Sequence, residues 1–440
     1  MARFLAYTSP ARGHLFPILP TLLELGRRGH EISLRTLGAE VERARAALAA
    51  VAPGASVRPI APAIETDLED YKARTPLGAI RRAVRAFIGR AAHELPDLGA
   101  AIREERPDAL FIDINSWGAA AVAEVSGLPW ATFSPYFLPV PSRDAPPFGP
   151  GFAPRQDLLG RVRDRLVRAL VFRWFNGPLP DLNAVRARAG APPLDGLERA
   201  CLRAPRLVYY TAEPFEYPRS DWPPSVRLVG PGIWEPEAPP PPWLALVDRP
   251  LVLVTLSTEF QDDGRLAQAA LDGLAGERDV LVVVTTASVD PAAFQPPPSA
   301  RVERFLPHAP LIARAACVVC HGGMGITQKA LAASVPVCVV PFGRDQLEVA
   351  RRVEVAGAGV RLPAPGLTPS RLRAAVRAAR ACREGAARVA RAFAAAGGPA
   401  AAASVLEELA AGRGRTPARA AAPEDGAPIG AERARLVTGT

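Results

Sequence analysis

Short apolar segments alternate with longer helix-forming segments along most of this chain. Residues 3–8 have the pattern of a short apolar strand, residues 15–27 have the pattern of an apolar helix opened by prolines, and residues 31–35, in which Ile32 and Leu34 alternate with polar residues, have the pattern of the next strand. Two strands joined by a helix form a β-α-β unit, and repetition of that unit implies a parallel sheet covered by helices on both faces. The alternation therefore predicts an α/β protein built from doubly wound, Rossmann-like sheets.

The alternation is interrupted once, by a proline-rich segment at residues 223–250. Consecutive prolines fit neither a helix nor a sheet ladder, so we expect an interdomain linker there. At 440 residues the chain is also longer than one hydrophobic core usually supports. We predict one Rossmann-like domain at residues 1–222 and a second at residues 251–411 that includes the closing helices. Residues 412–440 have little apolar content and are expected to be disordered.

The net charge of +9 would suit nucleic acid, but its distribution argues against that partner. Nearly all basic residues are arginines spread along the chain, without the interleaved aromatics of a single-strand binder. The five cysteines form no secretory pattern, and the N-terminus lacks the pattern of a signal peptide. No apolar stretch approaches the roughly 20 residues of a membrane span. We therefore expect a cytoplasmic protein that does not bind nucleic acid.

A glycine cluster stands between an apolar segment and a helix at residues 320–328, with the sequence CHGGMGITQ. Backbone amides and the helix macrodipole converge on an anion at such a junction. The glycines would let phosphate oxygens approach the main chain, and His321 could donate a hydrogen bond to them. By spacing alone, the pattern fits phosphate binding and plain strand-to-helix packing equally well.

Further segments extend this pattern in order: residues 305–308 (FLPH), 321–325 (HGGMG) and 341–346 (PFGRDQ). Together with Pro336 they resemble the donor-site signature of the UDP-glycosyltransferase family, and residues 13–17 (GHLFP) resemble its opening motif. That family has the GT-B fold, in which two Rossmann-like domains face a central cleft, and it includes bacterial enzymes that decorate natural products. The resemblance implies an N-terminal acceptor-binding domain and a C-terminal domain that binds a nucleotide sugar.

The resemblance also assigns donor-binding roles within the second domain. Phe305 would stack on the nucleotide base, although an aromatic at this position could equally belong to the core. His321 and the amides near Gly323 would hold the diphosphate, whereas Asp345 and its neighbour Gln346 would bind the sugar hydroxyls. A solvated turn is the alternative for that last pair. The residues expected to form the donor site are Ser257, Thr258, Phe305, His308, His321, Gly323, Met324, Gly325, Ile326, Asp345 and Gln346.

His14 is the predicted catalytic base. It stands in the loop after the first strand, at the carboxyl edge of the sheet, where such folds place their ligands. An imidazole there can take the proton from an acceptor hydroxyl as the oxygen attacks the anomeric carbon. Asp113 ends another apolar strand, and the family uses an aspartate there to orient the imidazole. The alternative for Asp113 is a cap on the helix that opens near Ser116.

The implied reaction is a single displacement that inverts the anomeric carbon and needs neither a metal nor another cofactor. The sequence agrees, since it contains no Asp-x-Asp pair. It departs from the family in three places. Ile326 stands where threonine is common, with Thr327 as a candidate substitute, and Val349 stands where asparagine is common. Lys329 replaces a ribose-binding glutamate and cannot accept hydrogen bonds, which points to a dTDP-activated rather than a UDP-activated donor.

The acceptor is expected to be a small apolar molecule of the polyketide type. The residues predicted to line its site are Trp117, Tyr136, Phe137 and Phe172, within a wider set that contains Phe133, Phe148, Phe152 and Trp174. Most aromatics at these spacings belong to a core instead. A lipid acceptor is the second reading, because arginines and leucines of residues 157–175 could lay that helix on an anionic membrane. A GT-B sugar-nucleotide epimerase and a non-catalytic helper protein are alternatives from other classes.

Overall fold

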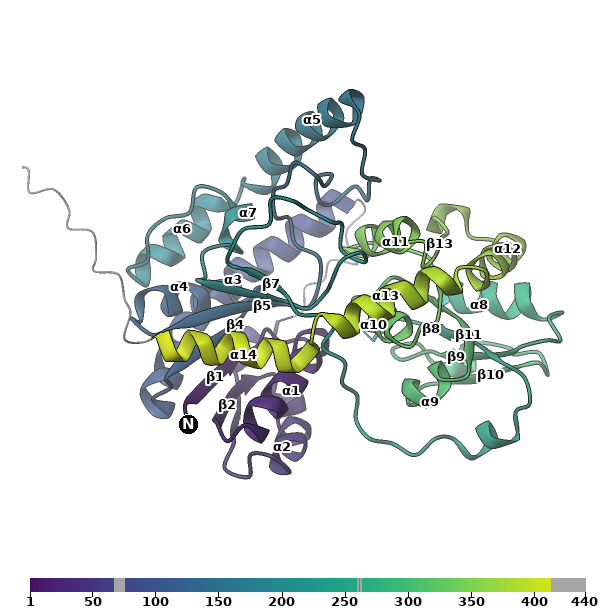
Figure 1. Cartoon of the computed structure of the whole chain (residues 1–440), viewed down its shortest axis with the longest axis horizontal. Coiled ribbons are helices and arrows are strands. Elements are labelled where there is room, and N and C mark those ends of the chain that lie inside the picture. The colour runs from purple at the N-terminus through teal and green to yellow at the C-terminus, as the bar shows by residue number, and fades with distance from the viewer. Residues whose placement is uncertain (67–75, 259–260, 262, 413–440) are drawn as a thin grey trace, which may run out of the picture.

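The computed structural model describes residues 1–66, 76–258, 261 and 263–412. It contains two parallel sheets, one in each half of the chain, and both are flanked by helices (Figure 1). The predicted doubly wound α/β architecture is confirmed. Apart from its first residue, the predicted disordered segment at 412–440 lies outside the described residues.

The first sheet has seven strands in the order β3-β2-β1-β4-β5-β6-β7. Its strands are β1 (Arg3–Tyr7), β2 (Glu31–Thr36), β3 (Ser56–Pro59), β4 (Ala109–Asp113), β5 (Trp130–Ser134), β6 (Arg206–Tyr209) and β7 (Val226–Leu228). All neighbouring strands are parallel, and β1 pairs with both β2 and β4. The strand order therefore changes direction between β1 and β4, a switch point of the kind at which such sheets bind ligands.

Helices cover both faces of this sheet. They are α1 (Arg12–Arg27), α2 (Val41–Ala49), α3 (Pro76–Glu105), α4 (Trp117–Val125), α5 (Leu158–Phe175), α6 (Leu179–Arg188) and α7 (Leu197–Ala200). The sequence predicts two helices over residues 77–105, but α3 is continuous through Pro96. Its packing along α4 outweighs the loss of one amide donor at the proline.

The second sheet has six parallel strands in the order β10-β9-β8-β11-β12-β13. They are β8 (Leu251–Thr255), β9 (Leu281–Thr285), β10 (Ala300–Glu303), β11 (Ala315–Cys320), β12 (Val337–Val339) and β13 (Gly359–Arg361). The helices are α8 (Gly264–Leu274), α9 (His308–Ile312), α10 (Met324–Ala332), α11 (Gln346–Val355), α12 (Pro369–Arg380), α13 (Arg383–Ala395) and α14 (Gly398–Ala411). The switch point of this sheet lies between β8 and β11.

The predicted linker at residues 223–250 begins too early. Its first part contains β7, whose Val226 pairs with Leu207 of β6 as the edge of the first sheet. The prolines at 223 and 224 precede the strand and so interrupt no ladder. The first domain therefore extends past residue 222, and only the chain after β7 connects the two sheets.

The closing helices do not all belong to the second domain. Helix α13 packs on α10, but α14 packs on α1 and joins the apolar core of the first sheet through Ala402, Ala403 and Leu406. The salt bridge between Arg28 and Glu407, at 2.7 Å, fastens it there. Residues 383–411 are apolar enough, by length and composition, for a membrane span, but they form two helices. A break separates them at Gly397, whose φ is +86°.

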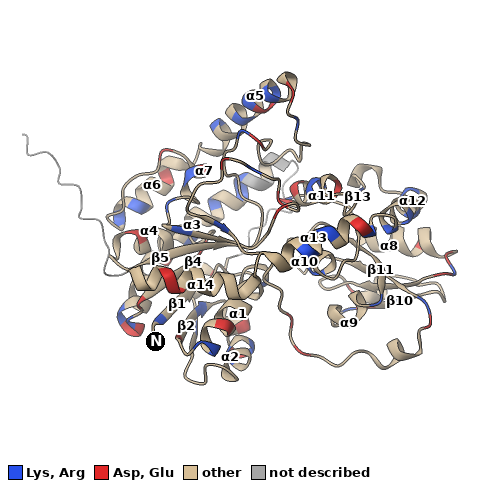
Figure 2. Cartoon of the chain, in the orientation of Figure 1, with Lys and Arg blue, Asp and Glu red and all other residues tan. Residues whose placement is uncertain are grey.

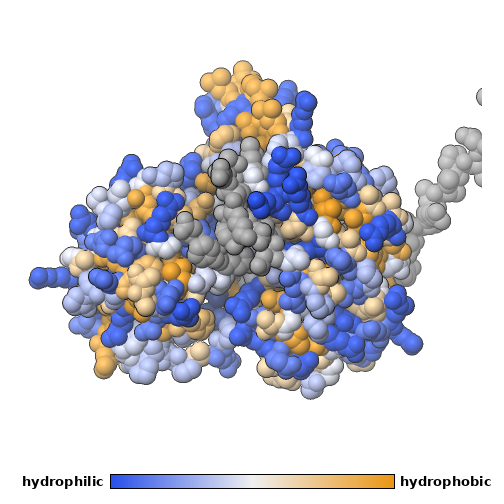
Figure 3. Space-filling model, turned by 180° about the vertical axis from the view of Figure 1, so that it is seen from behind, coloured by the Kyte–Doolittle hydropathy of each residue, from blue (hydrophilic) through white to orange (hydrophobic). Residues whose placement is uncertain are grey.

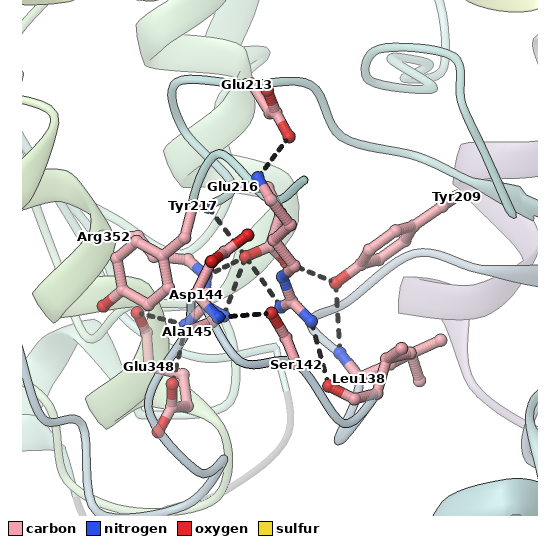
Figure 4. Close-up of polar contacts among 12 residues, drawn as sticks. Leu138, Ser142, Asp144, Ala145, Tyr209, Glu213, Glu216, Tyr217, Glu348 and Arg352 are labelled. Atoms are coloured by element: carbon pink, nitrogen blue, oxygen red, sulfur yellow. Dashed lines mark hydrogen bonds and ion pairs between the residues drawn. The ribbon is translucent and has the colours of Figure 1, made fainter. Parts of the chain in front are cut away.

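A buried ionic network joins the two domains (Figure 4). Arg352 of α11 is 3% exposed and donates to Glu216 of the first domain at 2.9 Å and to Glu348 at 2.6 Å. Its guanidinium lies 4.1 Å from the ring centres of both Phe137 and Tyr217. Burial alone would raise the pKa of the Glu216 carboxyl, but Arg352 and a second arginine outweigh burial and hold that pKa below its ordinary value. The network fixes how the second domain meets the first.

Candidate active site

His14 lies in the first turn of α1 rather than in the loop in which the sequence placed it. Its amide donates to the carbonyl of Ala11 at 3.0 Å. The prolines expected to open the helix, Pro17 and Pro20, lie inside it. Tertiary packing compensates for them, because Gly232 approaches so closely that a Cβ there would lie 1.8 Å from the Pro17 carbonyl oxygen. The imidazole is therefore attached to a helix, which holds a side chain more precisely than a loop.

Asp113 holds the imidazole of His14 from the end of the neighbouring strand. Nδ1 of His14 lies 2.9 Å and 3.0 Å from the two carboxylate oxygens of Asp113. Those oxygens also accept hydrogen bonds from the Ser9 amide at 3.0 Å and the Asn115 amide at 2.8 Å. Because a carboxylate only accepts, Nδ1 is the nitrogen that carries the proton in neutral His14, and Nε2 keeps its lone pair.

The alternative role for Asp113, a cap on the following helix, belongs to another residue. The amides of Gly118 and Ala119 in the first turn of α4 donate to Glu94 of α3 at 2.7 Å and 3.2 Å. Glu94 is fully buried, and burial raises its pKa to about 8. The carboxylate of Asp113 is thus directed at His14 and not at the helix.

Asn115 is a member of this group that the sequence analysis missed. Its Nδ2 lies 3.4 Å from Nε2 of His14, and its Oδ1 accepts a hydrogen bond from the Tyr136 hydroxyl at 2.7 Å. The rings of Tyr136 and His14 meet edge to face with centres 5.7 Å apart. Asn115 follows β4 directly, and its position at the same sheet edge as Asp113 is the signal that could have identified it.

Asp345 of the second domain lies within electrostatic range of this group. Desolvation raises the pKa of its carboxyl, and the charges of Arg344 and His14 partly offset that rise. Burial also raises the pKa of Tyr136, and the carboxylates of Asp113 and Asp345 raise it further. Asp345, which follows β12 at the carboxyl end of the second sheet, therefore interacts electrostatically with His14 and Tyr136 of the first domain.

The glycine cluster forms the junction between β11 and α10. Gly323 is the N-cap of α10, and an added Cβ there would lie 2.5 Å from Nε2 of His321. Only glycine lets the imidazole lie against the backbone in this way. Burial lowers the pKa of His321 to about 4, so its imidazole is neutral at physiological pH and can contact an anion only by a hydrogen bond.

The side chains of three neighbouring residues make contacts within the protein. The side chain of Met324 is 8% exposed and packs in the core, so only its backbone amide can face a ligand. Ile326 also packs against that core. The hydroxyl of Thr327 donates to the Gly323 carbonyl at 2.9 Å inside the helix, because a threonine in a helix readily bonds the preceding turn, and it does not replace the missing family threonine. Gly325 is exposed, with open space where a Cβ would be.

Gln346 is engaged within the protein rather than directed at a sugar. Its Oε1 accepts hydrogen bonds from the amides of Phe342 and Gly343 at 2.7 Å and 3.0 Å, and its Nε2 donates to Gln261 at 2.5 Å. Gln261 in turn donates to the Ser257 hydroxyl at 2.7 Å. Gln346 and Ser257 thus brace the loops of the site, whereas Thr258 is exposed beside them.

Phe305 is not a core residue. It is 68% exposed at the end of β10, so its ring is accessible for stacking, whereas large apolar side chains are usually buried. His308 begins α9 nearby and its Nε2 lies 3.1 Å from the Thr285 hydroxyl. Burial, with a smaller contribution from Lys329, lowers the pKa of His308 to about 4. Lys329 itself pairs with Glu235 of the linker at 2.9 Å.

The four residues predicted to line the acceptor site differ in burial and in their contacts. Phe137 is fully buried in the core, where it stacks against Arg352, and so it lines no acceptor site. Trp117 is partly buried and packs edge to face on Phe87 with ring centres 5.4 Å apart. Phe172 is partly buried on α5. Tyr136 alone among the four contacts His14 in the described residues.

Sequence comparison places the chain in a family. A family model for the C-terminal domain of erythromycin biosynthesis protein CIII-like proteins matches residues 269–409. Over 396 residues the chain is 36% identical to 4'-demethylrebeccamycin synthase of Lentzea aerocolonigenes, and the alignment covers 86% of this chain and 91% of that relative. The chain belongs to the bacterial natural-product glycosyltransferases.

Solved structures share the fold of this glycosyltransferase. CalG4, the calicheamicin glycosyltransferase, matches with a TM-score of 0.72 at 22% identity, over 93% of this chain and 98% of CalG4. VinC in complex with DTDP matches with a TM-score of 0.66 at 21% identity, over 93% of this chain and 99% of VinC. The predicted GT-B architecture and family are confirmed. Within the part of the chain that the structure describes, no group of three His, Cys, Asp or Glu side chains could hold a metal ion.

Proposed function

We propose that this glycosyltransferase moves a sugar from a nucleoside-diphosphate sugar to a hydroxyl of a small apolar acceptor, with inversion at the anomeric carbon. The pairing of His14 Nδ1 with the buried Asp113 at 2.9 Å carries the proposal. A neutral imidazole held in this way presents the lone pair of Nε2 to a substrate. Asp345 of the second domain faces the same region, where a donor sugar would be placed.

In the proposed reaction, Nε2 of His14 accepts the proton of the acceptor hydroxyl while the hydroxyl oxygen forms a bond to the anomeric carbon. The bond from that carbon to the diphosphate breaks on the opposite face, which inverts its configuration. Asp113 stabilises the imidazolium that forms. Negative charge develops on the leaving diphosphate, to which the first-turn amides of α10 and the neutral His321 can donate hydrogen bonds.

This mechanism assigns no step to a divalent metal. Helix-terminal amides and a histidine N–H supply the charge stabilisation that a metal would otherwise give to the leaving group. We expect EDTA to leave the rate of transfer unchanged and added Mg²⁺ or Mn²⁺ to raise it little. A rate that disappears with EDTA and returns with Mg²⁺ would overturn this part of the proposal.

We infer a dTDP-activated donor in preference to a UDP-activated one. Lys329 offers only hydrogen-bond donors, and its ammonium pairs with Glu235 at 2.9 Å, so it cannot accept the hydrogen bonds of ribose hydroxyls as a glutamate would. The bound nucleotide of the structural relative VinC, DTDP, agrees with this inference. Turnover measured with matched dTDP- and UDP-sugars tests it, since a clear preference for UDP-sugars would contradict it.

The central experiment is a screen of nucleotide sugars and apolar acceptors with mass spectrometry of the products. His14→Ala should keep donor affinity and lose transfer by at least about 100-fold, the contribution of a positioned general base. His93→Ala, at an exposed histidine of α3, is the matched control and should be unaffected. The anomeric configuration of the product, measured by NMR coupling constants, must be opposite to that of the donor. Retained configuration, or conversion of the nucleotide sugar without any acceptor, would refute the proposal.

A further inference from the structure

Helix α5 presents an apolar face to solvent. Its most exposed apolar side chains are between 49% and 72% exposed, namely Leu158, Leu159, Val162, Leu166 and Leu170. Four of them recur at every fourth position, which places them along one side of the helix. At 1.5 Å per residue the row is about 18 Å long. Figure 1 shows α5 projecting beyond both sheets, and Figure 3 shows apolar surface at that end of the molecule.

Arginines flank the apolar row (Figure 2). Arg161, Arg165 and Arg173 are exposed and form no ion pair with a described residue. The acidic residues of this segment are engaged, since Asp157 pairs with Arg155 at 2.5 Å and Asp164 pairs with Arg163 at 2.8 Å. The outward face of α5 therefore combines aliphatic side chains with unneutralised positive charge.

Two arginines of α5 beside the apolar row anchor the helix to the protein. Arg168 donates to the carbonyls of Ser142 and Ala145, and Arg163 donates to the carbonyl of Ala153 at 2.9 Å. The segment that these arginines hold also reaches the second domain, because the amides of residues 149 and 151 donate to Glu348 at 2.7 Å and 2.9 Å. The exposed apolar row thus lies on a helix that hydrogen bonds from its own arginines hold to the protein.

We propose that α5 docks this enzyme on an anionic lipid bilayer. The leucines enter the boundary between head groups and acyl chains, and Arg161, Arg165 and Arg173 contact the lipid phosphates. Charge complementarity selects this occupant, since the flanking side chains are cationic and the chain carries a net charge of +9. A second copy packed symmetrically on the same face would bring two rows of arginines together, which like-charge repulsion disfavours. The proposal depends on α5 and not on the chemistry at His14.

Co-sedimentation of the full chain with vesicles tests the proposal. One set of vesicles is phosphatidylcholine, and the other is an equal mixture of phosphatidylcholine and phosphatidylglycerol, both at physiological ionic strength. We expect binding to the mixed vesicles and at least about tenfold weaker binding to phosphatidylcholine alone. The double variants L166S/L170S and R161Q/R165Q should each weaken binding to the mixed vesicles by more than about tenfold.

Matched controls change similar residues at other exposed sites. Leu246→Ser removes an 86% exposed leucine, and R373Q/R391Q removes two exposed arginines of the second domain. Both controls should bind the mixed vesicles as the wild type does. No binding by the wild type, equal binding by the α5 and control variants, or loss of binding only in R161Q/R165Q would overturn the proposal. So would a wild-type dimer, seen by analytical ultracentrifugation, that L166S/L170S converts to monomer.

Discussion

Replacing Asp113 by asparagine keeps the size of the side chain and changes only what it can accept. The two carboxylate oxygens accept hydrogen bonds from different backbone amides, one from Ser9 at 3.0 Å and one from Asn115 at 2.8 Å. Whichever way an asparagine amide is turned, its NH2 group must therefore face one of those donors. It also offers a donor to Nδ1 of His14, which favours the tautomer whose proton is on Nε2. That tautomer cannot accept the proton of an acceptor hydroxyl.

We expect kcat of the Asp113→Asn variant to fall by about 10³- to 10⁴-fold, the loss seen when asparagine imposes the wrong tautomer in a Ser-His-Asp triad. Asp113 is fully buried and the residues of both amide donors are buried as well, so two donors that face each other should also lower the free energy of unfolding by about 1–3 kcal/mol. Donor affinity should not change, because Asp113 lies in the first domain and its hydrogen bonds to described residues join it to Ser9, His14 and Asn115, none of which is a predicted donor residue.

The assay is product formation at saturating donor and acceptor, with donor binding measured by calorimetry and stability by chemical denaturation. Asp108→Asn, at the opposite end of β4, controls for general damage to the sheet. Because His14 and Asp113 act as a unit, the double variant with His14→Ala should be no slower than His14→Ala alone. A kcat within about tenfold of wild type for Asp113→Asn, or additive losses in the double variant, would refute the assigned roles.

Three further predictions concern the second domain. Burial lowers the pKa of His321 to about 4, below the ordinary value of 6.5, so its contribution to stability is complete above pH 6.5 and is lost as the pH falls toward 4. Denaturation measured between pH 4 and pH 6.5 should show proton uptake on unfolding reduced by about one proton in His321→Gln, and an unchanged uptake would contradict this assignment. Arg352→Met removes one ion partner from each of the buried carboxylates Glu216 and Glu348, although Glu216 keeps Arg219, and it should lower the unfolding free energy by about 3–5 kcal/mol, read from denaturation curves. A loss comparable to that of a surface arginine would contradict the role of the network. Phe305→Ala should weaken nucleotide binding about tenfold in calorimetry while changing stability by no more than about 0.5 kcal/mol, and equal affinity for both proteins would show that this ring does not stack.

Positions fixed by strand alternation could be predicted from the sequence. In a parallel sheet, residues that follow adjacent strands meet at the carboxyl edge, which predicts that His14 and Asp113 lie at the same edge of the first sheet. The pairing of the two side chains is implied only by the family resemblance. The same argument places His321 at the switch point of the second sheet. The placement of these residues at the sheet edges depends only on which segments are strands, and the apolar runs identify most of those segments.

Roles that depend on tertiary contacts could not be predicted in this way. The side chain of Gln346 is hydrogen-bonded to its own loop, in which Arg344 adopts a φ of +53°. No local sequence pattern predicts that loop conformation. Phe137 and Phe305 are both followed by Leu-Pro in the sequence. Phe137 is nevertheless fully buried against Arg352, whereas Phe305 is 68% exposed. The sequence does not predict the short strand β7, because the prolines around it are typical of a linker. Only the tertiary structure shows that it pairs with β6.

The return of α14 to the first sheet has a consequence for synthesis of the protein on the ribosome. The alanines and leucine that this helix adds to the first core lie near the end of the described chain, after the entire second domain. The amino-terminal half therefore emerges from the exit tunnel long before α14, the helix that completes its hydrophobic core, has been translated. Chimeras that exchange amino-terminal halves between relatives should carry residues 398–411 with that half. Otherwise, the α14 of one relative would pack on the first-domain core of another.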